Sequence, residues 1–348
     1  MYYNVTMQKK NNITDLQLDQ KLIDEPFALL ELEKKLSKQQ KPYFNIELGD
    51  KTGRIRAKAW TEAIPNIDTN AKNGDIVAIT GKVQEYAGKP QIIVEKLEVV
   101  DDIAPEEFLV VTTRDRDQMM SDLSSEISKT KNPHLKKLLE LFWNNDEYRD
   151  KFVNFPAAEY VHHGYVGGLI EHVWEMNELS KPYLKLYPNL DRDLLFTGIF
   201  FHDVGKLNEL DIVGATIIRT NSGRLVAHIG QGLLFVDKLI SQIPDFPEDL
   251  KNKVYHMILS HQGSLEHGSP VVPQLIESLV LSQIDDASAS MNQAVKHIEK
   301  EYQTGNDFTD YHKWLKRSFY QKDYYGELSN ENPNDLDSST DKDQPELF

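Results

Sequence analysis

The chain contains no cysteine. That absence excludes a disulfide framework, a thiolate nucleophile and a zinc site with cysteine ligands. No uninterrupted apolar run approaches the ~18 residues of a membrane-spanning helix, and the first residues lack the apolar stretch of a signal peptide. We therefore expect a cytoplasmic protein with no membrane partner.

The chain also lacks an excess of positive charge. Its 39 Lys and Arg residues against 55 Asp and Glu residues give a net charge of −16, which argues against sequence-independent nucleic-acid binding by the chain as a whole. The deficit is uneven: residues 1–100 hold fifteen basic and fourteen acidic residues, whereas the last 28 hold two and eight. A local basic face is therefore compatible with this composition.

Residues 13–102 are predicted to form a small β-barrel. Apolar and polar residues alternate over 43–48 and 54–60, with a Gly-Asp-Lys-Thr-Gly turn between them. Further strands are predicted over 75–85 and 91–100, separated by a turn at residues 87–90. About five short strands in ~90 residues favour an OB-fold.

The remainder of the 348 residues is predicted to be mainly helical, so the fold class is multidomain α and β. Residues 1–102 form the predicted barrel, and 103–150 a linker with connecting helices. Residues 151–320 show helical periodicity throughout, and 321–348 form an acidic tail that we expect to be disordered.

Histidines are concentrated in the helical region, where nine of the eleven lie between His162 and His297. His172 is placed near the start of one predicted helix, the pair His202-Asp203 at the end of another, and Asp285 in a third. Neighbouring residues differ by ~100° around a helix, but at a helix end an imidazole and a carboxylate can converge on one ion. Mixed N and O ligands suit Mn, Fe or Zn better than Ca.

The ordered pattern His172…His202-Asp203…Asp285 resembles the signature of HD-domain metal-dependent phosphohydrolases. The segments 156–158, 162–172, 202–206 and 258–261 extend the resemblance to YhaM-type 3′→5′ exoribonucleases of Gram-positive bacteria, which also carry an N-terminal OB-fold. The similarity covers roughly residues 20–315. It implies a divalent metal cofactor, foremost Mn²⁺, with one or two ions.

The resemblance also implies roles for individual residues. His172, His202, Asp203 and Asp285 are the expected metal ligands, with Asp203 as the bridge if two ions bind. His228 and His261 are candidates for a second ion, and His256 is a weaker one. The chain departs from the family pattern at three positions, Gln262, Ser282 and Ser288.

Two further residues are candidates for catalysis. Lys206 follows Asp203 by one helical turn, from which its ammonium can reach a phosphate oxygen; the alternative is a solvated helix-end lysine. His163 is a candidate for substrate contact or for proton donation to the leaving group.

The predicted barrel offers a face for single-stranded nucleic acid. Arg54, Arg56, Lys58 and Trp60 share one side of a strand, which combines phosphate neutralisation with base stacking. Tyr86 and Tyr43 can add stacking surfaces. The alternative for this face is a solvated strand with one partly buried tryptophan.

These features together predict a metal-dependent 3′→5′ exonuclease for single-stranded RNA or DNA, and a homo-oligomer is compatible with them. One alternative is an HD phosphohydrolase for a small nucleotide, in which the barrel serves assembly or regulation. A second is a non-catalytic single-strand binder with a degenerate HD domain. The intact His and Asp pattern argues against the second alternative.

Overall fold

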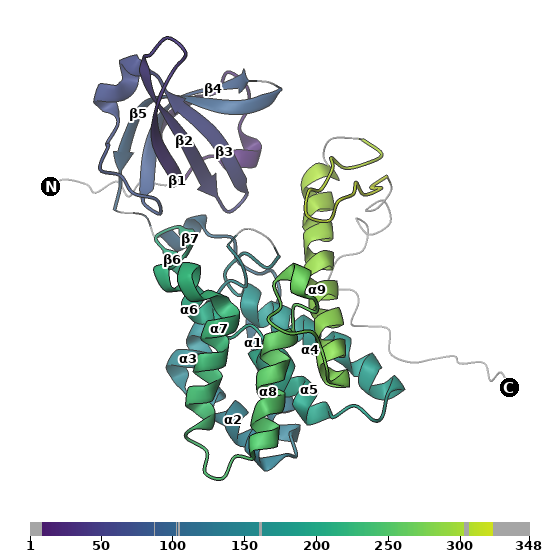
Figure 1. The fold of residues 1–348 in the computed structure, drawn as a ribbon. Helices are drawn as coiled ribbons and strands as arrows, with labels where there is room; N and C mark the ends of the chain where they lie inside the picture. Colours follow the sequence, from purple (N-terminus) through teal and green to yellow (C-terminus); the bar gives the residue numbers. More distant parts are fainter. Residues whose placement is uncertain are drawn as a thin grey trace. The chain divides into compact units, whose positions relative to one another are not determined.

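The computed structural model describes residues 9–322 apart from 87, 102, 104, 160–161 and 303–305. The chain divides into two units, residues 1–288 and 289–348 (Figure 1). The predicted disordered tail lies outside the described residues from position 323 on. Within the described part, no helix has both the length and the apolar composition needed to cross a bilayer.

The predicted N-terminal barrel is confirmed. Five strands close it in the order β1-β2-β3-β5-β4, with β3 and β5 parallel and the other pairs antiparallel. Figure 1 shows them in purple and blue. Their bounds are β1 Lys21–Leu36, β2 Pro42–Asp50, β3 Gly53–Ala59, β4 Ile76–Tyr86 and β5 Lys89–Val99.

The alternation on β3 sorts its side chains as predicted. Ile55, Ala57 and Ala59 are buried in the barrel core, whereas Arg54 and Arg56 face solvent. The outer face of the strand is therefore basic and its inner face is apolar, because successive side chains of a strand point to opposite faces.

The first strand is the element that the alternation does not locate. β1 spans 16 residues and pairs with both β2 and β4, which closes the barrel. Its register shifts twice, between Leu22 and Glu25 and between Leu29 and Glu31. Such irregularities interrupt the period of two, and the second half of β1 is rich in Leu, Glu and Lys, residues with low strand preference.

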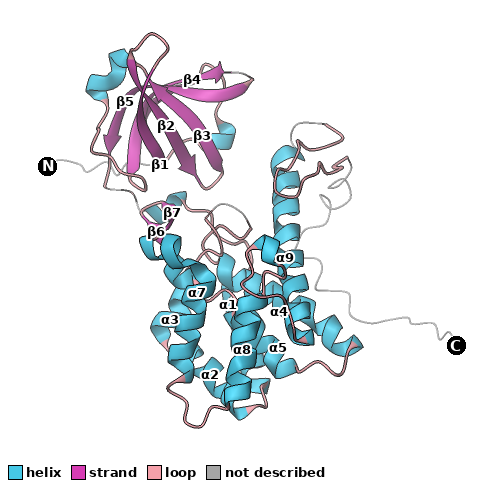
Figure 2. Cartoon of the chain, in the orientation of Figure 1, coloured by secondary structure: helices cyan, strands magenta, loops and turns pink. Residues whose placement is uncertain are grey.

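Helices dominate the rest of the chain (Figure 2). Their bounds are α1 Arg116–Lys129, α2 Pro133–Trp143, α3 Asp146–Asn154, α4 Gly168–Leu186, α5 Arg192–Phe201, α6 Lys206–Glu209, α7 Asn221–Ile240, α8 Glu248–Ser260 and α9 Ile276–Glu301. Short 3₁₀ turns occupy Ile13–Asp15, Thr61–Asn66, Pro105–Phe108 and Leu265–His267.

The helices from α1 onward share one apolar core. Leu123 of α1 and Phe142 of α2 belong to the same buried cluster as Ile170 of α4 and Phe200 of α5. The Phe142 ring makes edge-on contacts with Phe200 at a centroid distance of 5.3 Å. The helices predicted to connect the two domains therefore pack as part of the helical core.

The prediction of uninterrupted helix over 151–320 is wrong at two places. Two short strands, β6 (Leu210–Val213) and β7 (Thr216–Arg219), pair as an antiparallel hairpin between α6 and α7. Residues 306–322 also leave the helical pattern and form bridges between Phe308 and Tyr320 and between His312 and Arg317. In both places β-branched or aromatic residues flank a tight turn, which favours hairpins over helix.

Local backbone features place the functional side chains at helix ends. Gly205 has to be glycine, because a Cβ there would lie 1.9 Å from the carbonyl oxygen of His228. Ala227 interrupts α7 with a φ of 57°, a conformation that is strained for a residue with a side chain. The close approach at Gly205 and the kink at Ala227 together bring His228 next to the segment that carries His202 and Asp203.

Candidate metal centre

Six side chains from five separate segments converge at the ends of the helices. His172 comes from the start of the second turn of α4, and His202 and Asp203 directly follow α5. The other three are His228 of α7 after its kink, His261 directly after α8, and Asp285 of α9. All six were proposed as metal ligands from the sequence, and the structure groups them as two triads, His172–His202–Asp285 and Asp203–His228–His261.

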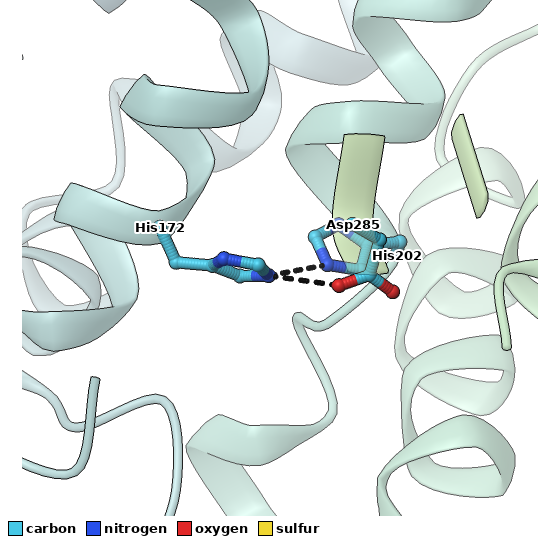
Figure 3. A group of neighbouring side chains, drawn as sticks. All are labelled: His172, His202 and Asp285. Carbon is cyan, nitrogen blue, oxygen red and sulfur yellow. Dashed lines mark hydrogen bonds and ion pairs between the residues drawn. The ribbon is translucent and has the colours of Figure 1, made fainter. Parts of the chain in front are cut away.

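The first triad brings its donor atoms into close contact (Figure 3). His172 Nε2 lies 3.3 Å from His202 Nε2 and 3.2 Å from Asp285 Oδ1. Both imidazoles are fully buried, and the Asp285 side chain is 14% exposed. Two ring nitrogens and a carboxylate oxygen thus point at one position.

Asp203 joins the two triads through its two carboxylate oxygens. Its Oδ2 faces the first triad, 3.4 Å from His202 Nε2 and 3.9 Å from His172 Nε2. Its Oδ1 faces the second, 3.5 Å from His228 Nε2 and 3.7 Å from His261 Nε2. This geometry supports the proposal that Asp203 bridges two ions.

Hydrogen bonds at Nδ1 fix the tautomers of three of the histidines. His202 Nδ1–H donates to the carbonyl oxygen of Ile199, and His261 Nδ1–H donates to that of Ile258. His228 Nδ1–H donates to the carboxylate of Glu209 at 2.9 Å. Because these acceptors carry no proton to give, each of the three rings keeps its proton on Nδ1 when neutral and presents a bare Nε2 to the centre.

The tautomer of His172 is fixed through a serine. The Ser288 hydroxyl donates to Glu175 Oε2 at 2.8 Å and lies 3.1 Å from His172 Nδ1. A hydroxyl has one proton, so Ser288 must accept the proton of His172 Nδ1–H, which leaves His172 Nε2 bare. This arrangement is the imidazole–acceptor contact that supports metal-binding histidines in general.

The donor set fits a divalent cation. Four unprotonated ring nitrogens face one another and two carboxylates, and of these nitrogens His261 Nε2 has the Gln262 side-chain amide 3.0 Å away as a possible donor. The Nε2 atoms of His172 and His202, only 3.3 Å apart, repel each other unless a positive charge lies between them. Asp203 Oδ1 and His228 Nε2 are moreover buried without a hydrogen-bond partner in the described part of the chain. Buried polar atoms of this kind need a partner, which a cation would supply.

The electrostatics of the pocket favour ionised carboxylates, and they favour neutral rings at His172 and His261. Burial raises the pKa of Asp203, but Lys206 and His202 outweigh it and hold that pKa well below its usual range. Burial likewise opposes ionisation of Asp285, but its contacts with His172 and His202 outweigh it and lower its pKa. Burial lowers the pKa of His172, and that of His261 to about 4. Burial also opposes protonation of His202, but the Asp203 carboxylate outweighs it and raises the pKa of that ring. Metal binding therefore requires that His202 give up its proton, because a ligand imidazole has to be neutral.

The outer face of the barrel gathers aromatic rings around one lysine. Lys58 Nζ lies 4.8 Å from the ring centroid of Tyr86, 5.4 Å from that of Trp60 and 5.8 Å from that of Tyr43. Trp60 and Tyr86 are 42% and 62% exposed. The rings thus keep free faces on which bases can stack.

The two arginines of this face are arranged differently. Arg54 lies 3.8 Å from Glu47, and Arg56 stands directly opposite the same glutamate in the β2–β3 ladder. Glu47 therefore offsets part of their charge. Lys38 and Lys41, which the sequence analysis did not single out, line a hollow with Trp60 at the β1–β2 loop.

Comparisons with known proteins agree with both parts of the structure. Residues 31–100 match the model of the OB-fold nucleic acid binding domain, and residues 169–290 match that of the HD domain. The 3'-5' exoribonuclease YhaM of Geobacillus sp. (strain WCH70) is 32% identical over 282 residues, which cover 80% of this chain and 85% of that protein. The protein of the same name from Bacillus subtilis (strain 168) is 31% identical over 281 residues, covering 80% and 88%.

The chain belongs to the YhaM family. This membership confirms the predicted family and the predicted order of an OB-fold followed by an HD domain. The HD domain and the His and Asp cluster together support a divalent metal centre in this YhaM-family protein.

The two catalytic candidates occupy different positions. The Lys206 ammonium lies 2.9 Å from Asp203 Oδ2, the oxygen that faces the first triad. His163 is fully buried, and its Nε2 lies 3.2 Å from Glu175. Direct contact of His163 with substrate stays a prediction, and its surroundings favour a supporting role behind His172.

His162 also lies close to the first triad, although the sequence pattern assigns it no role. It is half-buried, and its ring centroid lies 5.6 Å from that of His172. Burial, assisted by Lys206, lowers its pKa to about 3, so the ring is neutral at pH 7. His256 lies apart from both triads, because its Nε2 accepts a hydrogen bond from the backbone of Gln274.

The side chains that hydrogen-bond to the proposed ligands were not predicted from the sequence. Glu175 follows His172 by three residues, so both lie on one face of α4. Glu175, Glu171 and His163 cluster closely, and the guanidinium of Arg114 contacts both carboxylates. Because Arg114 already supplies positive charge there, we interpret this cluster as support for the centre and not as a third metal site.

The Ser288 relay makes a specific prediction about metal affinity. Ser288→Ala and Glu175→Gln should each weaken binding of Mn²⁺ about 10- to 100-fold, because His172 loses the contact that fixes its tautomer. Competition against a fluorescent chelator measures this affinity directly. Ser282→Ala is the matched control, since within the described residues the Ser282 hydroxyl hydrogen-bonds only to the carbonyl oxygen of Leu279 in the same helix. Equal affinities for Ser288→Ala and Ser282→Ala would contradict the relay.

Proposed function

We propose that this protein is a metal-dependent exonuclease that removes nucleotides from the 3′ end of single-stranded RNA, with single-stranded DNA as a second substrate. The observation that carries the proposal is the complete donor set, six side chains with bare ring nitrogens, in a chain of the YhaM family. The names of the relatives supply the direction and the RNA substrate, and they favour this function over hydrolysis of a small nucleotide.

The six side chains would hold one or two divalent ions, for which we propose Mn²⁺. Such an ion lowers the pKa of a water molecule and offsets the negative charge of a phosphodiester. His172, His202 and Asp285 would form one set of ligands, and His228 and His261 the other, with Asp203 shared between them. Glu209 and the Ser288–Glu175 pair hold the rings in the required orientation.

Residues at the edge of the centre would handle the substrate. Lys206 carries a positive charge beside Asp203 Oδ2, where it can stabilise a phosphate oxygen. His162 is neutral and partly exposed, so it can donate a hydrogen bond to the phosphodiester or to the departing oxygen. The barrel face around Lys58 would hold the single strand by stacking and by charge.

The decisive test is a time course on single-stranded RNA labelled at either end, with Mn²⁺ or with a chelator. We expect a 5′ label to yield a descending ladder and a 3′ label to be released at once as a mononucleotide. Activity in chelator, or release of a 5′ label first, would overturn the proposal.

Asp203 should be indispensable for hydrolysis. Asp203→Asn keeps the side-chain volume but removes the charge that both triads share, and it should lower the rate at least ~10²-fold. Asp286→Asn is the matched control, an exposed aspartate on α9 next to Asp285. Thermal melting of both variants checks that the fold persists. Comparable rates for the two variants would refute the assignment of Asp203.

The barrel face should contribute affinity for long strands. Trp60→Ala should weaken binding of a 30-nucleotide single strand about tenfold, because base stacking on one ring is worth ~1–3 kcal/mol. Fluorescence anisotropy in chelator measures the affinity without cleavage. Tyr187→Ala removes a comparably exposed ring from the helical part and serves as control. An unchanged affinity in Trp60→Ala would assign strand capture elsewhere.

Stable duplexes should stop the enzyme. Stacking needs bases that have left the duplex, and the sequence has no Gly-x-x-x-x-Gly-Lys-Ser/Thr loop for a nucleotide-driven motor. Opening DNA costs ~1.4 kcal/mol per base-pair step. A hairpin substrate with a 3′ overhang should therefore be trimmed to near the stem, as a sequencing gel would resolve. Steady digestion through a G·C-rich stem would contradict this expectation.

A further inference from the structure

Residues 306–322 form a small hairpin that the proposed mechanism does not use. Phe308 bridges to Tyr320 and His312 to Arg317, with a turn over residues 313–316. Backbone bonds from Thr309 to Phe319 and from His312 to Arg317 close it at 2.9 and 2.8 Å. We refer to these residues as the 306–322 hairpin.

His297 of helix α9 contacts the hairpin. The His297 ring packs edge-on against His312 at a centroid distance of 4.8 Å, and its Nε2 donates to the carbonyl oxygen of Asp310. Thr309 and Gln321 are buried at the base. The Phe319 ring also lies edge-on to His297, at a centroid distance of 6.3 Å. Polar contacts and this ring contact therefore hold one side of the hairpin against α9.

Four other aromatic side chains of the hairpin are exposed to solvent, although the Phe308 and Tyr320 rings also contact each other at a centroid distance of 5.2 Å. Phe308, Tyr311, Trp314 and Tyr320 are 57%, 61%, 75% and 55% exposed. Tryptophan has one of the largest apolar surfaces of any side chain, so its exposure loses much of the stabilisation that burial would give. Four such rings within 13 residues form a surface that suits a ligand.

Cations alternate with these rings. Lys313, Lys316 and Arg317 lie within three residues of Trp314 in the sequence, and no carboxylate pairs with any of the three in the described part of the chain. The hairpin holds four basic and two acidic residues in a chain whose net charge is −16. Lys316 also adopts a φ of 52°, a strained turn conformation that binding surfaces often retain.

We propose that the 306–322 hairpin is a second binding surface for single-stranded nucleic acid, with bases stacked on Trp314 and Tyr311 and phosphates neutralised by Lys313, Lys316 and Arg317. Exposed rings between unpaired cations are the composition that single strands require. Aromatic residues and arginine are frequent in protein interfaces as well, but lysine is depleted there, so Lys313 and Lys316 beside Trp314 favour nucleic acid over a protein partner. The inference rests on the proposed function and adds to it a surface outside the OB-fold and the HD domain.

Binding measurements on the full chain test the proposal. We compare the parent, Trp314→Ala, and the triple variant Lys313→Ala, Lys316→Ala, Arg317→Ala by anisotropy with a labelled 30-nucleotide RNA in chelator. Trp314→Ala should weaken binding about tenfold. The triple variant should reduce the slope of log K against log salt by about 2, since each phosphate contact on a single strand contributes ~0.7. The double variant Lys185→Ala, Tyr187→Ala removes an exposed cation and ring from α4 and its C-cap and should change neither quantity.

Each outcome has a distinct meaning. Unchanged affinity and salt slope in well-folded hairpin variants would overturn the inference, even if the parent degrades RNA. Loss of self-association in light scattering without loss of RNA binding would also overturn it, and would identify the hairpin as a contact between copies. Weakened RNA binding in the variants, together with a parent that never cleaves RNA, would support the hairpin and refute the proposed function.

Discussion

The structure of the centre depends on one buried carboxylate that two groups of side chains share. Asp203 faces His202 and Lys206 with one oxygen and His228 and His261 with the other. It can do so only because it directly follows the end of α5, where the backbone leaves the helix, and because Gly205 lets α7 approach within contact. Without that glycine the carbonyl of His228 would be displaced and the two triads would separate.

Four histidines around this carboxylate create a strong electrostatic requirement. Each ring presents a bare Nε2, because its Nδ1 proton is held by a carbonyl oxygen, a carboxylate or Ser288. Bare nitrogens and ionised carboxylates are all hydrogen-bond acceptors, so they cannot satisfy one another. The side chains that hold the Nδ1 protons thus raise the electrostatic energy of the empty centre, and a bound cation lowers it. In this way residues that do not touch a metal can set the affinity for it.

The sequence predicts the ligands better than it predicts their supports. His172, His202, Asp203 and Asp285 stand in an order that the HD pattern contains, and helical periodicity places each near a helix end or on an inner face. Ser288 and Glu175 meet across 113 positions of sequence through the packing of α9 on α4, which no local pattern encodes. The barrel strands can be predicted from the alternation of apolar and polar residues, except for β1, where register shifts interrupt the alternation. The strands β6 and β7 are too short to interrupt the helical periodicity of the residues around them.

The acidic composition of the chain and its affinity for nucleic acid are compatible for a physical reason. At physiological ionic strength charges are screened over ~8 Å, so a strand senses the side chains that it touches and little of the net charge. Lys58 among three rings on the barrel is the local surface that we propose for this contact. Acidic residues elsewhere would weaken adsorption of phosphates outside the two proposed faces. Affinity therefore comes to depend on stacking, which only unpaired bases can provide. An acidic chain with few aromatic and basic faces thereby distinguishes single strands from duplexes more sharply than a basic chain would, because duplex binding rests mainly on phosphate charge.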